Sequence, residues 1–178
     1  MGGLFNTVFL LLIGFAAMAQ PTPGKEKISI DLPATMRWKS TKVPKDTKAI
    51  RGILYTVRGE KNGAPVDSVV ITTIDKRYFS LRAEGTPEEK WAYVKSECPT
   101  AELTIVDKKI IDAGRTAILY LIKPEDADSG ACSSSVLLTY VIEGPTALHT
   151  IEVHIPTLLF NSGILEQWRD ILLRASIS

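Results

Sequence analysis

The chain has 178 residues, with 21 basic and 20 acidic side chains and a formal net charge of +1. A nucleic-acid-binding domain usually carries a strong basic excess, so this charge balance argues against a nucleic-acid partner. Every charged side chain lies beyond Ala19. The region 20–178 is long enough to form one domain with a substantial core.

An apolar segment occupies the beginning of the chain. Val8 to Ala19 is twelve residues without a charged or polar side chain, whereas a membrane-spanning helix needs about 20. This length is typical of a signal peptide, and Ala17 and Ala19 fit the small residues before a cleavage site. We predict a signal peptide over 1–19, cleavage between Ala19 and Gln20, and a periplasmic or secreted protein without a stable membrane anchor. Because MGGLFNT lacks Lys and Arg, an uncleaved short anchor is the alternative.

The two cysteines, Cys98 and Cys132, lie in the region predicted to be exported. In an oxidising compartment they favour one disulfide, which would stabilise the fold by roughly 3–4 kcal/mol. Two separate buried thiols are the alternative. Two cysteines without neighbouring histidines cannot complete a tetrahedral zinc site, and no metal or other cofactor is predicted.

Strand patterns dominate the first half of the predicted domain. ISIDLP (28–33) predicts a short strand, and the basic segment MRWKSTKVPKDTK (36–48) predicts an exposed loop. Segments 49–59 and 66–74 are rich in β-branched residues and flank Asn62-Gly63, a typical hairpin turn. These two segments should pair antiparallel.

A helix is predicted in the middle of the chain. Thr86, Pro87 and Glu89 form a helix start with a Thr-x-x-Glu capping box. Pro99 ends the pattern, so the helix should cover about 87–97.

Four strands and a second helix follow. The strand segments pair across two turns, at 112–115 and at Gly144-Pro145; they are 101–112, 116–123, 134–143 and 146–155. Ala117 to Ile122 is apolar on both faces, so both faces of the sheet must be covered. Apolar residues recur at helical spacing in 162–177, which predicts the second covering helix.

The predicted fold is therefore α+β. It is an antiparallel sheet of six to seven strands, covered by two main helices within a single domain over 20–178.

Four short stretches resemble the PsbP-like and DcrB-like α/β/α group. They are ISIDLPATMRW at the first strand, AEGTPEEKWAYV at the first helix, IDAGRTAILYL at a strand pair, and EQWRDILLRASIS at the closing helix. The usual Ser-Phe-x-Val tail of the group is replaced by Ala175 to Ser178. The resemblance implies an α/β/α sandwich and a non-enzymatic accessory, assembly or binding protein. It assigns no functional residue, since the group has no shared active-site motif.

Catalytic patterns are weak. His149 and His154 would point to opposite faces of one strand, so they cannot bind one metal together. His154 with Glu152 could orient an imidazole for acid–base chemistry, although a polar pair on the sheet face is the simpler interpretation. EDADSG (125–130) departs from a calcium loop and is interpreted as an acidic turn. A cysteine paired with His149 would be reactive only if reduced.

The basic loop is the candidate contact surface, comprising Arg37, Trp38, Lys39, Lys42 and Lys45. Trp38 could anchor a partner; alternatively, it packs on the sheet edge while the lysines are solvated. The function hypothesis is an exported, non-enzymatic protein of the bacterial envelope that binds another envelope protein or a small ligand. The alternatives are an exported hydrolase that uses His154 and Glu152, and an immunity-like inhibitor of a secreted toxin.

Overall fold

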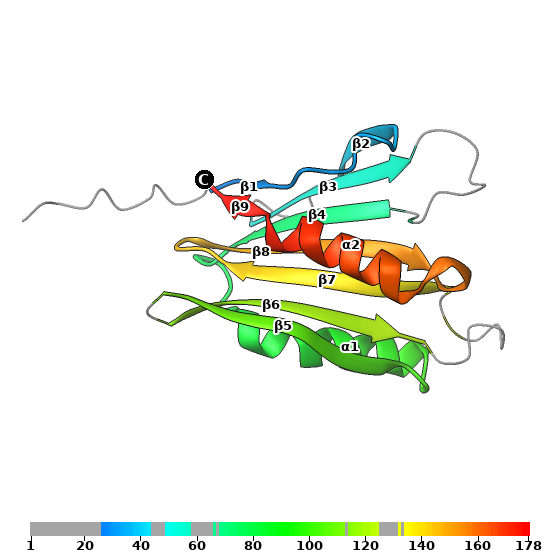
Figure 1. Cartoon of the computed structure of the whole chain (residues 1–178). Helices are drawn as coiled ribbons and strands as arrows, with labels where there is room; N and C mark the ends of the chain where they lie inside the picture. The colour runs from blue at the N-terminus through cyan, green and yellow to red at the C-terminus, as the bar shows by residue number, and fades with distance from the viewer. Residues whose placement is uncertain are drawn as a thin grey trace, which may run out of the picture.

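The protein is an antiparallel sheet with one helix packed on each face (Figure 1). The computed structural model describes residues 26–43, 49–57, 66, 68–112, 114–124, 132 and 134–178. The main sheet has 7 strands in the order β2-β3-β4-β8-β7-β6-β5, and β1 and β9 form a separate 2-stranded sheet. This arrangement confirms the predicted α+β class.

The element bounds are as follows. The strands are β1 Ile28–Ser29, β2 Trp38–Val43, β3 Ile50–Val57, β4 Ser68–Asp75, β5 Glu102–Asp112, β6 Arg115–Lys123, β7 Ser135–Glu143, β8 Ala147–Pro156 and β9 Ser176–Ile177. The helices are α1 Thr86–Glu97 and α2 Ser162–Leu173, with short 3₁₀ turns η1 Ala83–Gly85 and η3 Thr157–Leu159.

The predicted hairpins are present. β3 pairs antiparallel with β4, β5 with β6, and β7 with β8. β8 also pairs with β4, and this pairing joins the first hairpin to the later strands. The Asn62-Gly63 turn lies outside the described residues.

One sequence interpretation near the start was wrong. The segment predicted as an exposed basic loop contains β2, which pairs with β3 from Trp38–Val57 to Val43–Gly52. The short strand predicted in 28–33 is present as β1, but it covers only two residues and its partner is β9 rather than a strand of the main sheet. An edge strand exposes most of its side chains, so β2 lacks the apolar alternation by which strands are recognised.

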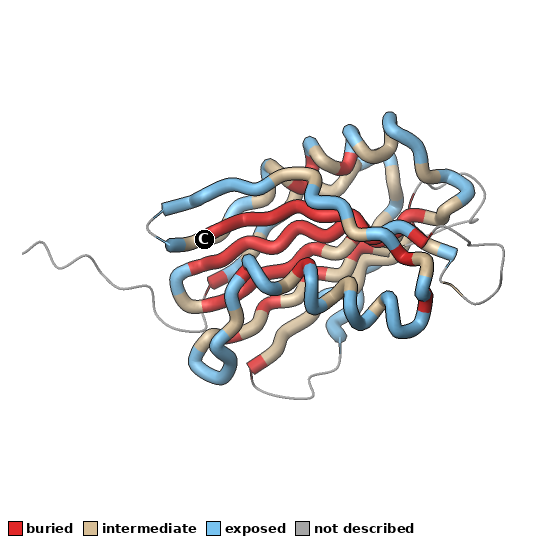
Figure 2. The backbone as a smooth tube through the Cα atoms, turned by 90° about the horizontal axis from the view of Figure 1, so that it is seen from below, coloured by how far each residue is buried: buried red, intermediate tan, exposed pale blue. Residues whose placement is uncertain are grey.

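The two faces of the sheet have separate cores, and the buried positions run along neighbouring strands of the sheet (Figure 2). Leu119 and Leu121 of β6 point to the core beneath α2, which includes the fully buried Trp168. Tyr120 and Ile122 point to the other core, beneath α1. The strand that is apolar on both sides is therefore covered on both sides, as predicted.

The predicted capping box of α1 was also wrong. The helix is capped at Gly85 without a side-chain hydrogen bond, and Thr86 is already its first residue. The Thr86 hydroxyl instead donates to the Arg82 carbonyl at 3.0 Å. The 3₁₀ turn η1 runs directly into the helix, so the Thr86 backbone is helical rather than extended.

Candidate functional site

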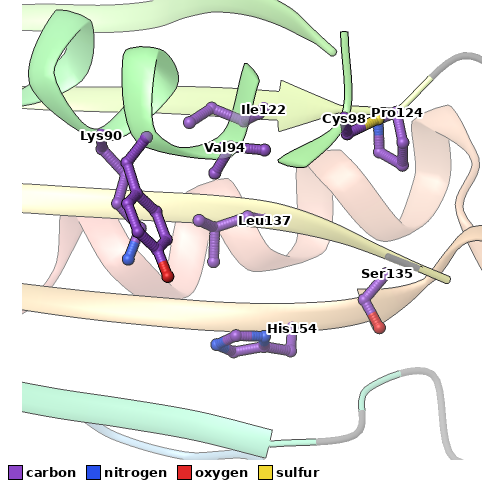
Figure 3. A pocket seen from close by; sticks show the side chains of 9 residues that line it. Lys90, Val94, Cys98, Ile122, Pro124, Ser135, Leu137 and His154 are labelled. Carbon is purple, nitrogen blue, oxygen red and sulfur yellow. The ribbon is translucent and has the colours of Figure 1, made fainter. Parts of the chain in front are cut away.

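A pocket of about 170 Å³ lies between α1 and strands β6, β7 and β8 (Figure 3). Its lining is mainly apolar and includes a few polar side chains. The lining residues are Lys90, Tyr93, Val94, Cys98, Ile122, Pro124, Ser135, Leu137 and His154. An apolar cavity of about 150 Å³ accommodates one benzene molecule. The pocket can therefore hold one ring or one large apolar side chain.

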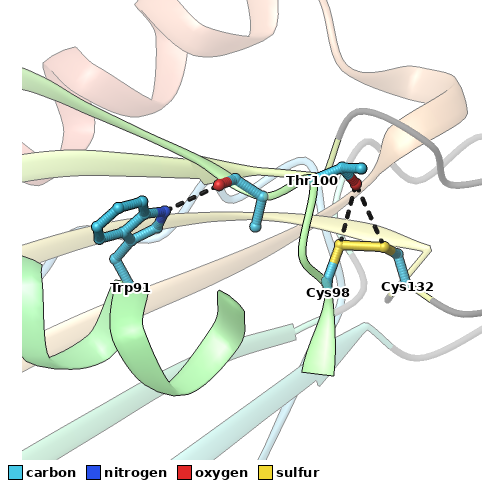
Figure 4. Close-up of a disulfide and its surroundings, with 5 residues drawn as sticks. Trp91, Cys98, Thr100 and Cys132 are labelled. Atoms are coloured by element: carbon cyan, nitrogen blue, oxygen red, sulfur yellow. Dashed lines mark hydrogen bonds between the residues drawn. A yellow bond between two sulfur atoms is a disulfide. The ribbon is translucent and has the colours of Figure 1, made fainter. Parts of the chain in front are cut away.

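The chain after α1 is held by a disulfide at the pocket. Cys98 is bonded to Cys132, at an S–S distance of 2.07 Å across a sequence separation of 34. The Thr100 hydroxyl lies 3.6 Å from both sulfur atoms (Figure 4). Nearby, the Trp91 indole donates to the Ala101 carbonyl at 2.8 Å, which fixes α1 against the start of β5. The bridge and this hydrogen bond together position one wall of the pocket.

An ion pair lies beside the pocket. The Lys90 ammonium donates to both carboxylate oxygens of Glu152, at 3.0 and 3.1 Å. His154 Nε2 is 3.9 Å from Glu152 Oε2, beyond hydrogen-bond distance. The Glu152 carboxylate is thus held mainly by Lys90. Ser135 and His154 share the pocket lining, which was not foreseen from the sequence.

A buried phenol lies in the same core. Tyr120 is fully buried beneath α1. Burial raises the pKa of its hydroxyl well above the ordinary value, so the phenol stays neutral at physiological pH. It contributes no negative charge to this side of the sheet.

His149 lies on the other face of the sheet from His154, as predicted, and is fully buried. Its Nδ1 is 3.0 Å from the Thr73 hydroxyl and its Nε2 is 3.3 Å from the Glu26 carboxylate. Glu26 also accepts hydrogen bonds from the Thr146 amide and hydroxyl, at 2.6 and 2.7 Å. Any side chain at Gly144 would collide with this carboxylate. The cluster holds the segment before β1 onto the β7–β8 turn.

The His149 cluster predicts a pH dependence of stability. Burial lowers the pKa of the His149 imidazole below its ordinary 6.5, and nearby Arg51 and Lys76 lower it further, although Glu26 opposes this. Below pH 6.5, the ordinary pKa of histidine, the unfolded chain binds a proton at His149 that the folded chain does not bind. The free energy of unfolding should therefore fall on acidification. Urea unfolding between about pH 7 and 5 measures the effect.

His149→Gln should flatten this pH profile, because glutamine does not titrate in the range. His154→Gln is the matched control and should retain the slope. An unchanged slope in His149→Gln would assign the dependence to another group.

Glu143, the last residue of β7, is a second buried carboxylate. It accepts from the Lys76 ammonium at 2.7 Å, lies 3.7 Å from an Arg82 nitrogen, and is 3.5 Å from the Ala83 amide. A buried carboxylate needs such partners to offset its desolvation. These contacts join β7 to η1. They give Glu143 a structural role that accounts for its burial.

The predicted contact surface is only partly exposed. Trp38 is half-buried; its ring meets Trp168 edge-on at 6.4 Å, and its indole donates to the Pro33 carbonyl at 3.1 Å. Arg37, Lys39 and Lys42 are exposed. Lys45, the acidic segment 125–130 and the predicted cleavage site at Ala19 and Gln20 lie outside the described residues.

Within the described ranges, no helix is long and apolar enough to cross a membrane. The same residues contain no cluster of three or more His, Cys, Asp or Glu side chains suited to a metal ion.

No protein-family model matches the chain, and no curated protein matches it by sequence. Among solved structures, it is similar to the solution structure of cyanobacterial PsbP (CyanoP) from Synechocystis sp. PCC 6803. That match has a TM-score of 0.40 and 8% identity, and covers 83% of this chain and 98% of the other. This is the group that the sequence motifs resemble. The likeness carries no information on activity or partners.

Proposed function

We propose that this is an exported, non-enzymatic binding protein of the bacterial envelope, whose pocket beneath α1 receives one apolar group of a protein partner or small ligand. The observation that carries the proposal is that Cys98 both lines the pocket and forms the disulfide. A structural disulfide favours an oxidising compartment, which agrees with the signal peptide predicted over 1–19.

The size of the pocket supports a single anchoring group. Pockets for drug-sized ligands are typically about 300–1,000 Å³, whereas this one is about 170 Å³. Buried aromatic or aliphatic anchors commonly dominate protein interfaces. A single apolar side chain or one ring of a small ligand fits this volume.

A ring-sized probe tests the pocket. Adding benzyl alcohol to the purified protein should shift the methyl NMR signals of Val94, Ile122 and Leu137, because these side chains line the pocket. Val94→Trp should abolish the shifts by filling the space. Ala92→Trp, on an exposed position of the same helix, is the matched control and should preserve them. Shifts spread over the surface, or unaffected by Val94→Trp, would contradict the proposal.

A hydrolase is the second candidate, because His154 and Ser135 line the same pocket. The 3.9 Å separation between His154 and Glu152, and the hold of Lys90 on that carboxylate, argue against an acid–base pair. Hydrolysis of 4-nitrophenyl acetate that is lost in His154→Ala would favour this candidate over the binding protein.

A further inference from the structure

β2 is an edge of the main sheet, and no described element pairs with its outer side. Its six residues pair with β3 in one unbroken register. The opposite edge, β5, is interrupted by two register shifts. Bulges are one means of blocking further strand pairing. Of the two edges, β2 is therefore the one whose regular backbone can accept another strand.

β2 and the residue before it also differ in charge from the opposite edge of the sheet. Arg37, Lys39 and Lys42 are exposed, and none of them forms an ion pair with a described residue. Many cations elsewhere do have an acidic partner: Lys76, Arg77, Arg82, Lys90, Lys108, Arg115 and Arg169. β2 contains no acidic residue, whereas β5 mixes acids with lysines.

We propose that β2 is the docking site for an acidic, extended segment of a partner protein, which adds a strand to the edge of the sheet. In strand addition, backbone hydrogen bonds supply affinity and alternate side chains supply specificity. The positive charge of β2 attracts an acidic strand and repels a second copy of β2. This surface is separate from the pocket, so the proposal goes beyond the function proposed above.

The positions of the lysines in β2 set the spacing of acidic residues that the partner strand must carry. Lys39 lies opposite Thr56 and Lys42 opposite Ile53, so the two lysines point to opposite faces of the sheet. Acids three residues apart in the added strand would face one lysine each, at the close spacing of directly opposed residues. Trp38 is not the anchor of this contact, because it packs against Trp168.

Three blocked peptides test the proposal by NMR on the purified protein. Acetyl-Thr-Val-Glu-Thr-Val-Glu-Thr-amide should shift the β2 amide signals, and rising salt should weaken its binding. The same peptide with Lys in place of Glu should not bind, because it repeats the charge of β2. The peptide with Pro in place of Val should not bind either, since proline cannot donate to the ladder.

Two double variants locate the charge effect. Lys39→Glu/Lys42→Glu should weaken binding of the acidic peptide by roughly tenfold or more, since two attractions become repulsions. Lys109→Glu/Lys123→Glu makes the same change in net charge on exposed positions of β5 and β6, and should leave binding unchanged.

The proposal is overturned if the unaltered protein does not bind the acidic peptide, or if both double variants lose binding equally. Binding of the proline peptide as tightly as the acidic one would exclude strand addition. Each of these outcomes is independent of the benzyl alcohol result, so the two proposals fail separately.

Discussion

Reducing the Cys98–Cys132 disulfide should lower the free energy of unfolding by roughly 3–4 kcal/mol. The bridge spans a sequence separation of 34, so breaking it returns substantial conformational freedom to the unfolded chain. Because the total stability of a domain is typically about 5–15 kcal/mol, this is a large fraction. Urea unfolding of the oxidised and reduced protein measures the difference.

The matched control is Cys98→Ala/Cys132→Ala, whose stability should not respond to reductant. Benzyl alcohol binding should also weaken on reduction, because Cys98 lines the pocket. Equal stability of the oxidised and reduced protein would contradict a structural role for the bridge. Non-reducing mass analysis of envelope material should find a bridged chain that begins at Gln20.

Trp168→Ala should destabilise the fold by about 3–5 kcal/mol, the usual cost of removing a fully buried tryptophan. Trp168 lies at the centre of the contact between α2 and the sheet and is 0% exposed. Its indole nitrogen has no hydrogen-bond partner among the described residues, so the loss is one of packing. Urea unfolding checks the magnitude.

Two further substitutions test whether the loss of stability comes from lost packing at Trp168. Trp168→Phe removes volume but no hydrogen bond within the described part of the chain, so it should cost less than Trp168→Ala. Trp38→Ala should cost less as well, because Trp38 is only half-buried. A Trp38→Ala protein of unaltered stability would contradict the packing role and restore Trp38 as a candidate interface anchor.

The later hairpins were predictable because their sequence signals are local. The segments that became β5 to β8 are long, and a short turn joins the two strands of each hairpin, so the pairing could be predicted. The strands β6 and β7 are also strongly apolar, which indicated that both faces are buried. The opposite orientations of His149 and His154 followed from the alternation of side chains along a strand. The covering helices were predictable from the two apolar faces of β6.

The edge of the sheet and the buried polar cluster were not predictable in this way. β2 has five exposed positions out of six, so neither face carries an apolar pattern. The Glu26–His149 contact joins residues 123 positions apart, and nothing near Glu26 marks it as buried. The requirement for Gly144 beside that carboxylate becomes visible only once the chain is folded.

The pocket depends on the same kind of long-range placement. Val94 comes from a helix, Leu137 from a strand, and Cys98 from the segment between α1 and β5. The disulfide was the one element of this site that composition and compartment could suggest. The joint contribution of Ser135 and His154 to the lining required the β7–β8 register, in which Leu137 is opposite His154.

The pairing of β1 with β9 has a consequence for the order of assembly. Lys27 and Ser178 exchange two backbone hydrogen bonds, at 2.9 and 3.0 Å, so the first described strand is completed by residues 176–178. Contacts between segments far apart in the sequence form late, because the intervening chain must close into a loop first. A polypeptide in which residues 176–178 have not yet been synthesised therefore leaves β1 unpaired, and this two-stranded sheet forms only after those residues are available.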